Sequence, residues 1–441
     1  MKGKLTAALL CTAISFGATA QHTEKCVSEY VLNARIGNDP AKIAAIEAAK
    51  LEAKERLVQY EQQLSSSAQK GTGTTAVVTI PLVFHFVLTA QQQSEIGGPA
   101  NISRRVQTQI TALNNDFNGK NTDISNVPAA FKSVIGNAEI NFTIARRDPK
   151  GKTTSGIEIK TITTPTEFSE TSGDEKYTNR GGYDAWDPTK YLNVWVVNLR
   201  DGLLGYAISA QNAKAAGLMQ EGGVVIDYAA FGTAGISDKF FINGIDRGRT
   251  MVHEVGHYFD LPHIWGTKDD CSDDDDIGDT PQQADANKTC PTTAPANCKN
   301  SAGGEMFMNY MDYVNDACMI MFTKGQVNRM RAQVATGGAA FSLTQSNVTS
   351  WPTDVATIEN ANTLNVYPNP AGSAFNLNFA QQTQGLRSID ILSVTGQTVK
   401  SISISQQSSN YHIDAADLGK GIYILHCRFE EATITRKIVL Q

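Results

Sequence analysis

Apolar and polar residues follow one another along the central part of the chain in patterns typical of strands and amphipathic helices. β-prone runs cover residues 77–88, 138–144, 191–198 and 223–227, and helical spacing covers 102–117 and a stretch that begins near Asp246 or Thr250, either of which is a candidate N-cap. Strands that alternate with helices predict an α/β (α+β) domain in which a twisted sheet backs the last of these helices.

A different pattern begins after about residue 341, where Ser, Thr, Asn and Pro become frequent, as in a linker. From Leu364 onward the β-prone runs are short and are separated by turn residues; they include 375–379, 388–394, 400–404, 422–427 and 432–440. Their spacing predicts a separate all-β sandwich of roughly seven strands.

The first twenty residues combine a basic start, an apolar run from Leu5 to Phe16 and the small-residue signal Ala18-Thr19-Ala20. This order predicts a signal peptide over residues 1–20. The run is shorter than the ~20 residues that span a bilayer, and no other stretch is long and apolar enough. We therefore expect a protein that works outside the cytoplasm and has no transmembrane segment.

Residues 40–64 are rich in Ala, Glu and Lys and carry apolar residues at helical spacings. The polar stretch 65–74 that follows is typical of a flexible, cleavable linker. A small helical unit in this place predicts a pro-segment over residues 21–75. The alternative is an ordinary N-terminal helix of the α/β domain.

Charge and cysteine content bear on the class of partner and on disulfide formation. The formal net charge of -6 is mild and points to no nucleic-acid partner. Four cysteines cluster in one region, and an even number in an oxidising compartment predicts disulfides. They are Cys271, Cys290, Cys298 and Cys318. All three pairings are possible from spacing alone, and a structural zinc is the alternative, although no C-x-x-C pair is present. Cys26 and Cys427 are left over.

The stretch from His253 to His263 carries the chemistry. His253 and His257 are four residues apart, so on a helix both rings project from one face and can share a metal ion. His263 follows beyond the predicted helix end as a third candidate ligand. Three nitrogens leave a fourth position open, as in a catalytic zinc site. Glu254 is placed to hold and deprotonate a zinc-bound water rather than to bind the metal.

Asp260 departs from the extended pattern H-E-x-x-H-x-x-G-x-x-H, which has Gly at this turn. Gly accepts positive φ without steric cost, and Asp is one of the few other residues enriched there. Three alternatives remain at this point: an amphipathic helix without a metal, a gluzincin-like peptidase in which a downstream Glu replaces His263, and a secreted binding protein with a degenerate metal site.

Four segments in this order resemble the pappalysins, and within them the ulilysin-like peptidases: residues 253–263, 271–281, 309–313 and 316–319. The resemblance extends over about residues 76–335. Pappalysins are a branch of the metzincins, so it implies a metzincin-like zinc endopeptidase with an upper twisted sheet and a lower, irregular subdomain. It also implies protein or peptide substrates.

Several positions take a role from this resemblance. Met311 matches the Met-turn residue beneath the zinc ligands, and Tyr313 matches a tyrosine that can donate a hydrogen bond to the developing oxyanion. Asp316 matches the acid at the base of a specificity pocket, which implies a preference for Arg or Lys on the primed side of the cleaved bond. The family pairing of cysteines joins Cys271 to Cys298 and Cys290 to Cys318.

The acidic run 273–276 offers hard oxygen ligands, which suit Ca²⁺, although such a run alone is more often a solvated loop. In ulilysin-like enzymes this loop binds calcium. The resemblance nominates Asp274 and Gly278 through their carbonyls, Asp275 through its carboxylate, and Thr280.

Cys26 is the candidate for latency, because a pro-segment thiolate can occupy the fourth zinc position in several metzincins. The flanking Lys25 and Val27 differ from the Arg and Gly that usually surround such a cysteine.

The C-terminal region resembles the type A sorting domain, which directs proteins through the type IX secretion system. The resemblance rests on Tyr367-Pro368-Asn369-Pro370 at its start and Lys437-Ile438-Val439-Leu440 at its end. A carbohydrate-binding or adhesive sandwich is the alternative. With the signal peptide, this implies export through the periplasm to the cell surface or beyond, with the secretion machinery as a partner.

The complete prediction is a secreted zinc metalloendopeptidase that also binds calcium. It divides the chain into a signal peptide (1–20), a pro-segment (21–75), a catalytic domain (76–335), a linker (336–362) and a β-sandwich sorting domain (363–441).

Overall fold

The computed structural model describes residues 25–69, 76–235, 238, 240–268, 270–350, 364–379, 385–393, 398–429 and 433–441. The predicted signal peptide and residues 351–362 of the predicted linker therefore lie outside the described residues. The chain forms two compact units, one of Met1–Thr143 with Ile157–Ser346 and the other of Ile144–Gly156 with Asn347–Gln441. The predicted domain boundaries stay predictions.

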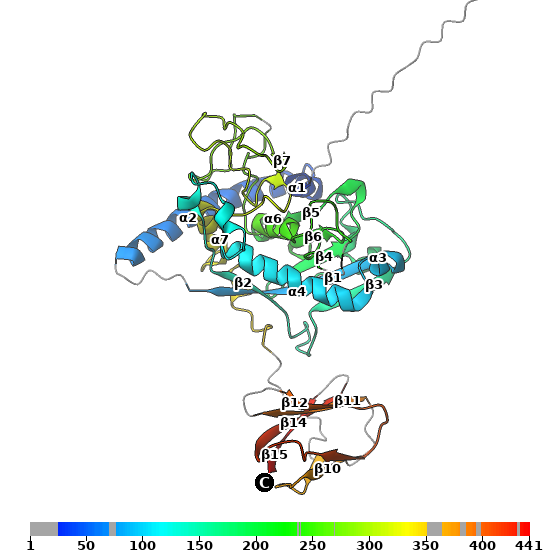
Figure 1. Ribbon diagram of the computed structural model, residues 1–441. Helices are drawn as coiled ribbons and strands as arrows, with labels where there is room; N and C mark the ends of the chain where they lie inside the picture. The colour runs from blue at the N-terminus through cyan, green and yellow to red at the C-terminus, as the bar shows by residue number, and fades with distance from the viewer. Residues whose placement is uncertain are drawn as a thin grey trace, which may run out of the picture. The chain divides into compact units, whose positions relative to one another are not determined.

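The first unit is built on a six-stranded sheet with the order β2-β1-β4-β6-β5 and with β3 also paired to β1 (Figure 1). The strands are β1 (Val78–Thr89), β2 (Ile140–Ile144), β3 (Ile157–Ile162), β4 (Leu192–Val197), β5 (Gly205–Ile208) and β6 (Gly223–Asp227). β1 runs parallel to β3 and β4, and β4 runs parallel to β6, whereas the edge strand β5 runs antiparallel to β6. Every residue of β4 and β6 is buried, as expected of parallel strands covered on both faces.

Helices of the first unit surround this sheet, and the bounds of the α-helices are α1 (Ser28–Ile36), α2 (Pro40–Gln69), α3 (Ala90–Glu95), α4 (Gly98–Phe117), α5 (Ala210–Ala215), α6 (Arg249–Tyr258), α7 (Lys324–Val334) and α8 (Phe341–Thr344). Short 3-10 turns cover Ile124–Asn126, Lys132–Val134, Asp174–Lys176, Thr178–Arg180, Arg200–Gly202 and Met219–Glu221. A two-stranded ladder joins β7 (Lys288–Thr289) to β8 (Tyr313–Val314). α6 packs on β5, β6 and α4, so the sheet backs this helix as predicted.

Two details of the helices differ from the predictions. The N-cap of α6 is Gly248, at φ 73°, and neither Asp246 nor Thr250 takes this position. Glycine is required there because a Cβ would lie 2.9 Å from the Gln109 amide, which donates to the Gly248 carbonyl at 2.8 Å. α2 continues to residue 69, into the predicted linker, and the hydroxyl of Ser65 bonds back to the carbonyl of Glu61.

The second unit contains two antiparallel sheets, in the orders β13-β10-β9 and β12-β11-β14-β15. Their strands are β9 (Leu364–Tyr367), β10 (Ala374–Phe379), β11 (Leu386–Ser393), β12 (Thr398–Ser403), β13 (Asn410–Asp414), β14 (Gly421–Phe429) and β15 (Thr433–Leu440). Alternate residues of β10 are buried, and Phe375 and Leu377 share one core with Ile391, Leu425 and Ile438 of the other sheet. The predicted fold class, an α/β domain with a separate all-β unit, is confirmed.

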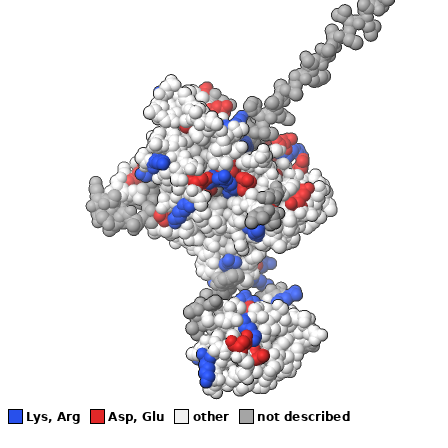
Figure 2. All heavy atoms as spheres, viewed as in Figure 1, with Lys and Arg blue, Asp and Glu red and all other residues white. Residues whose placement is uncertain are grey.

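None of the helices in the described part of the chain has both the length and the apolar character needed to cross a membrane. On the face of the molecule in Figure 2, basic and acidic side chains are interspersed. Neither charge sign gathers into one broad patch on this face.

Candidate metal centre and active site

Three histidine rings converge at the C-terminal end of α6. His253 and His257 project from one face of the helix, which ends at Tyr258, and His263 returns from the loop that follows. The Nε2 atom of His257 lies 3.0 Å from that of His253 and 3.1 Å from that of His263. The structure therefore brings all three sequence-predicted ligands to one point.

The hydrogen bonds of the His253 and His257 rings determine which ring nitrogen presents a lone pair to the point where the three rings meet. Nδ1 of His253 lies 2.7 Å from the Tyr310 carbonyl, and Nδ1 of His257 lies 2.6 Å from the Leu261 carbonyl. A carbonyl can only accept, so each Nδ1 carries the proton and each Nε2 presents a lone pair. Burial lowers the pKa of His257 to about 4 and that of His253 well below its usual range.

Unprotonated rings whose lone pairs meet at about 3 Å repel one another unless a cation lies between them. The donor set is three imidazole nitrogens, which suits a tetrahedral zinc ion with one further position. The residues present therefore fit the metal that the sequence predicts. Among the described residues, the metal-ligating group at this point contains Cys26 and the three histidines but no downstream Glu, and their ligand atoms all lie within 4.8 Å of one another.

Asp260 makes the turn that returns His263 to the other two rings. Its φ is 76°, the left-handed conformation that the motif normally reserves for glycine. Its Oδ2 accepts hydrogen bonds from Arg329 Nε at 3.1 Å and Gln333 Nε2 at 3.3 Å, both on α7. The departure from glycine thus ties the turn to a neighbouring helix.

Met311 lies directly beneath α6. Its side chain is fully buried, and a Cβ on Gly256 would lie 2.7 Å from the Met311 sulfur. Gly256, directly before His257 in the H-E-x-x-H motif, leaves the space that this close approach of Met311 requires. Asn309 Oδ1 accepts from the Met311 backbone N–H at 2.9 Å and fixes this turn.

Glu254 is fully buried beside the histidines. Its Oε2 accepts from the Ser28 hydroxyl at 3.2 Å and lies 3.4 Å from Cys26 Sγ, and within the described part of the chain Oε1 has no hydrogen-bond partner. Burial raises the pKa of this carboxyl to about 8. A carboxyl with a raised pKa in a cleft is typical of a proton-transfer group.

Tyr313 closes the other side of the histidine cluster. Its hydroxyl donates to the Cys26 carbonyl at 2.6 Å and lies 3.1 Å from His263 Nε2. Trp265, which sequence reasoning missed, stacks on His263 with ring centroids 4.4 Å apart and an interplanar angle of 6°. The signal available for Trp265 was its position two residues after the last histidine.

The segment around Cys26 runs along the edge strand β5. Cys26 forms a parallel bridge with Gly205, and the Leu204 N–H donates to the Lys25 carbonyl at 3.2 Å. Cys26 is 2% exposed. Burial, with the neighbouring Glu254, raises the pKa of its thiol well above the usual range.

Asp316 lines a small recess that the Lys25 side chain enters. Its Oδ2 accepts from the Arg247 N–H at 2.7 Å, and within the described part of the chain Oδ1 has no hydrogen-bond partner. Lys25 Nζ donates to the Val314 carbonyl at 3.0 Å, and Asp316 and Asp312 both act on it electrostatically. Desolvation outweighs these carboxylates and lowers the pKa of Lys25 to about 8.

The loop that holds the predicted calcium residues is stapled by two disulfides, Cys271–Cys298 and Cys290–Cys318, the pairing that the resemblance implies. Asp275 is 2% exposed; its Oδ1 accepts from the Thr280 hydroxyl at 2.7 Å, and its Oδ2 has no hydrogen-bond partner among the described residues.

Burial raises the pKa of Asp275 to about 7. Asp274 and Gly278 lie in the same turn, where Asp274 accepts from the Asp276 N–H at 2.9 Å. The structure thus brings Asp275 and Thr280 together directly.

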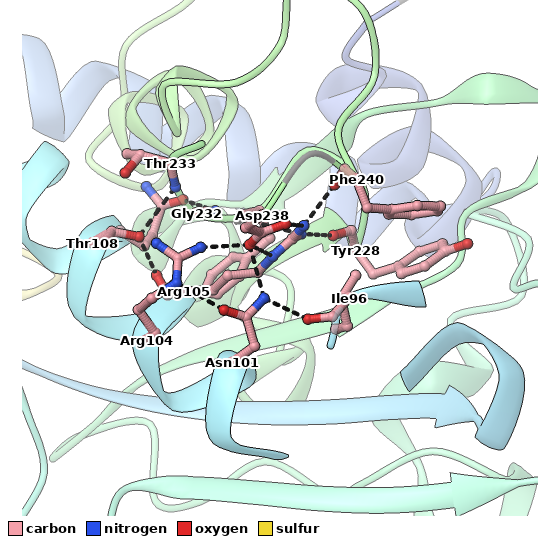
Figure 3. Close-up of polar contacts among 12 residues, drawn as sticks. Ile96, Asn101, Arg104, Arg105, Thr108, Tyr228, Gly232, Thr233, Asp238 and Phe240 are labelled. Atoms are coloured by element: carbon pink, nitrogen blue, oxygen red, sulfur yellow. Dashed lines mark hydrogen bonds and ion pairs between the residues drawn. The ribbon is translucent and has the colours of Figure 1, made fainter. Parts of the chain in front are cut away.

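A buried arginine fixes the segment that leads into α6 (Figure 3). Arg105 of α4 is fully buried and meets Asp238 in a bidentate pair with two bonds of 2.7 Å, while its Nη2 also donates to the Phe240 carbonyl at 2.6 Å. Asn101 and Arg104 donate to the same carboxylate. These residues were not predicted, because their partners are more than 130 positions away in the sequence.

Comparisons with known proteins agree with this geometry. The family model described as Pregnancy-associated plasma protein-A matches residues 176–335. A solved structure of Tannerella forsythia mature mirolysin in complex with a cleaved peptide is 41% identical, with 63% of this chain and 100% of that chain covered and a TM-score of 0.57. The chain belongs to the pappalysin family.

Two further comparisons place this pappalysin among secreted enzymes. A Tannerella forsythia promirolysin mutant is 38% identical, with 73% of this chain and 97% of that chain covered and a TM-score of 0.62. An extracellular metalloprotease of Arthroderma gypseum is 28% identical over 275 residues, which are 62% of this chain and 77% of that protein. The precursor form of mirolysin thus matches more of this chain than the mature form, 73% against 63%.

The second unit also has a match. The model described as Secretion system C-terminal sorting domain matches residues 365–441. This pappalysin is therefore a secreted metallopeptidase with a C-terminal sorting domain.

Proposed function

We propose that this pappalysin is a zinc endopeptidase made as a latent precursor, which cleaves extracellular proteins or peptides before Arg or Lys. The observation that carries the proposal is the convergence of the Nε2 atoms of His253, His257 and His263 beside the buried carboxyl of Glu254. This combination serves peptide hydrolysis better than any binding role, because a binding site needs no proton-transfer group.

When bound, zinc supplies Lewis-acid chemistry: it polarises the peptide carbonyl and lowers the pKa of water toward neutrality. Glu254 accepts the proton of the attacking water and then donates it to the leaving amine. Tyr313 donates its hydroxyl hydrogen to the oxyanion that develops on the carbonyl, an interaction typically worth a few kcal/mol of barrier. Met311 supports α6 from below and keeps both helical ligands in position.

Latency is proposed to come from the segment around Cys26, which engages three parts of the machinery at once. Its thiolate would hold the metal as a fourth ligand, and its carbonyl accepts a hydrogen bond from the Tyr313 hydroxyl. Ser28 donates to Glu254. Because the raised thiol pKa disfavours the thiolate unless a cation is close, the same contact is coupled to metal binding.

Asp316 is proposed to select a basic residue on the primed side of the cleaved bond. Its buried Oδ1, with no protein donor among the described residues, faces the recess that Lys25 occupies. In the precursor Lys25 would thus fill the pocket that later receives Arg or Lys of the substrate.

Calcium is proposed to bind at Asp275, with Thr280 and the carbonyls of Asp274 and Gly278 completing the site. The support is the buried Oδ2 of Asp275, which has no donor among the described residues, in a loop rich in carboxylates. A hard cation with oxygen ligands would satisfy this group.

The experiment that tests the enzyme assignment is a Glu254→Ala substitution in the activated protein. Zinc content should stay at that of the wild type, since Glu254 is not a ligand, while hydrolysis of casein should fall by several orders of magnitude. A variant that still cleaves casein would refute the proposed role of Glu254. A wild-type protein that binds zinc but cleaves nothing would favour the degenerate-site alternative.

A further inference from the structure

A second buried contact holds α1 to the rest of the first unit, away from the histidine cluster. The guanidinium of Arg35, near the C-terminal end of α1, pairs through Nε with Glu221 Oε2 at 2.5 Å. Its Nη2 donates to the Glu170 carbonyl at 2.8 Å, and its Nη1 donates to the Thr171 carbonyl. Both charged side chains are less than 10% exposed, at 8% and 9%.

The acceptors of this guanidinium line a recess. The second oxygen of Glu221 accepts from the Tyr177 hydroxyl at 2.9 Å, and its carbonyl accepts from Lys176 Nζ at 2.6 Å, so the carboxylate is fixed in place. Gly173, at φ 66°, forms one wall, where a Cβ would collide with the Arg35 guanidinium. A flat cation fits between this wall and acceptors that lie on three sides.

All walls of the recess belong to residues 170–221, downstream of the predicted pro-segment. When the pro-segment leaves, the Glu221 carboxylate keeps its Tyr177 donor but loses its arginine partner. The Glu221 carboxylate and the two backbone carbonyls of the recess are then acceptors without their cationic donor, and charge-assisted bonds to another guanidinium would restore these contacts.

We propose that this recess is a guanidinium-binding subsite, filled by Arg35 in the precursor and by an arginine side chain of the polypeptide substrate in the mature enzyme. The inference rests on the proposed peptidase function. It adds a second basic determinant, separate from the Asp316 pocket.

The course of the pro-segment places this subsite on the side opposite to Asp316. Lys25 lies in the Asp316 recess, Cys26 lies at the histidines beside Gly205, and α1 then leads to Arg35. If the Asp316 pocket takes the residue after the cleaved bond, the Glu221 recess takes a residue before it.

The reach of an extended peptide gives the position. Two extended residues from Cys26 and then seven helical residues up to Arg35 span at most about 17 Å, at about 3.3 Å and 1.5 Å per residue. An extended substrate covers that length with about five residues. The arginine is therefore expected within about five positions before the cleaved bond.

The first experiment titrates the pro-segment fragment 21–75 into the activated protein by calorimetry, which requires no catalysis. Arg35→Ala in the fragment should weaken binding about 10- to 100-fold, as expected for lost charge-assisted bonds. Arg35→Lys should also weaken binding, because the three N–H donors of an ammonium sit on one nitrogen and cannot reach acceptors spaced around a planar guanidinium. When the same fragments bind a Glu221→Gln protein, the difference in affinity between the wild-type and Arg35→Ala fragments should shrink to a few-fold.

Arg56→Ala is the matched control, because Arg56 donates to a neutral acceptor, Gln211 Oε1, at 3.2 Å. This change should weaken binding less than about threefold. Equal binding of the wild-type and Arg35→Ala fragments would overturn the subsite. Casein hydrolysis, measured on the same protein, reports separately on the proposed function.

The second experiment compares peptide substrates that carry Arg or its neutral isostere citrulline at each position before the cleaved bond. A preference for Arg of at least about fivefold in kcat/KM is expected at one position, within about five residues before the bond. Glu221→Gln should remove this preference. Equal cleavage of the Arg and citrulline peptides at every position would overturn the proposal, even if the Gln variant fails to fold.

Discussion

Asp260 shows how a departure from a motif is accommodated. Its backbone adopts the left-handed turn that the motif requires, and its carboxylate pairs with Arg329 across 3.1 Å. The first property follows from the known tolerance of Asp for positive φ. The second was not predictable, because Arg329 lies 69 residues further along the chain.

Asp260→Ala should therefore lower the melting temperature. Alanine pays about 1–2 kcal/mol in the left-handed region, and the partly buried pair with Arg329 is lost as well. Asp260→Gly removes the backbone cost but not the loss of the pair, so its melting temperature should lie between those of wild type and Asp260→Ala. Thermal unfolding of the three proteins measures this order. An Ala variant as stable as the wild type would contradict it.

Cys26→Ala should abolish latency. The substitution removes the proposed fourth ligand, so water can enter the metal position before the predicted pro-segment is cut. Hydrolysis of a short peptide by freshly purified precursor measures this effect, and at least a tenfold increase is expected. Cys427→Ala is the matched control, because Cys427 is also buried and forms no disulfide within the described part of the chain, but lies in the second unit. A Cys26→Ala precursor that stays fully latent would remove the proposed switch.

At the scale of elements, the sequence predicts those parts whose signal is local. α4, α6, β4 and five strands of the second unit (β10, β11, β12, β14 and β15) follow from apolar periodicity, and the histidine spacing follows from helix geometry. β3 and β5 were not predicted, because a short strand is defined mainly by its pairing with another strand and not by its own sequence pattern. The N-cap of α6 was predicted wrongly, since the choice of Gly248 depends on Gln109 of another helix.

The loop around Asp275 is an element whose order should depend on calcium. The buried Oδ2 of Asp275 has no hydrogen-bond partner among the described residues, which is energetically unfavourable. A bound cation would offset this cost. A chelator that removes calcium but is too weak for zinc should lower the melting temperature of the wild type. The Asp275→Asn variant should not respond to the same chelator. An unchanged wild-type melting temperature would count against the site.

At the scale of the whole molecule, the candidate active site and the sorting domain lie in different units. The first unit carries the metal centre, and the second matches a secretion sorting domain. In the second unit, the last strand β15 pairs with β14, and Gln441 N donates to the Ala371 carbonyl at 2.9 Å. The end of the chain is thus part of the folded sorting domain.

Removal of residues 363–441 should leave the protein in the periplasm with its metal centre intact. Immunodetection in periplasm and medium measures the distribution, and zinc content checks the first unit. Removal of residues 433–441 alone should have the same effect, because it deletes the edge strand β15 and with it Ile438, a fully buried residue of the core of the second unit. Unchanged secretion of both truncated proteins would contradict the sorting role.

The most direct test of the central claim is the cleavage profile of the activated protein on a peptide library. We predict cleavage of bonds followed by Arg or Lys, lost on removal of zinc and restored by its return. The primed-side preference should disappear in Asp316→Asn, whose side chain no longer carries the charge that attracts the basic residue. Absence of zinc-dependent cleavage, or cleavage without a basic residue after the bond, would contradict this account.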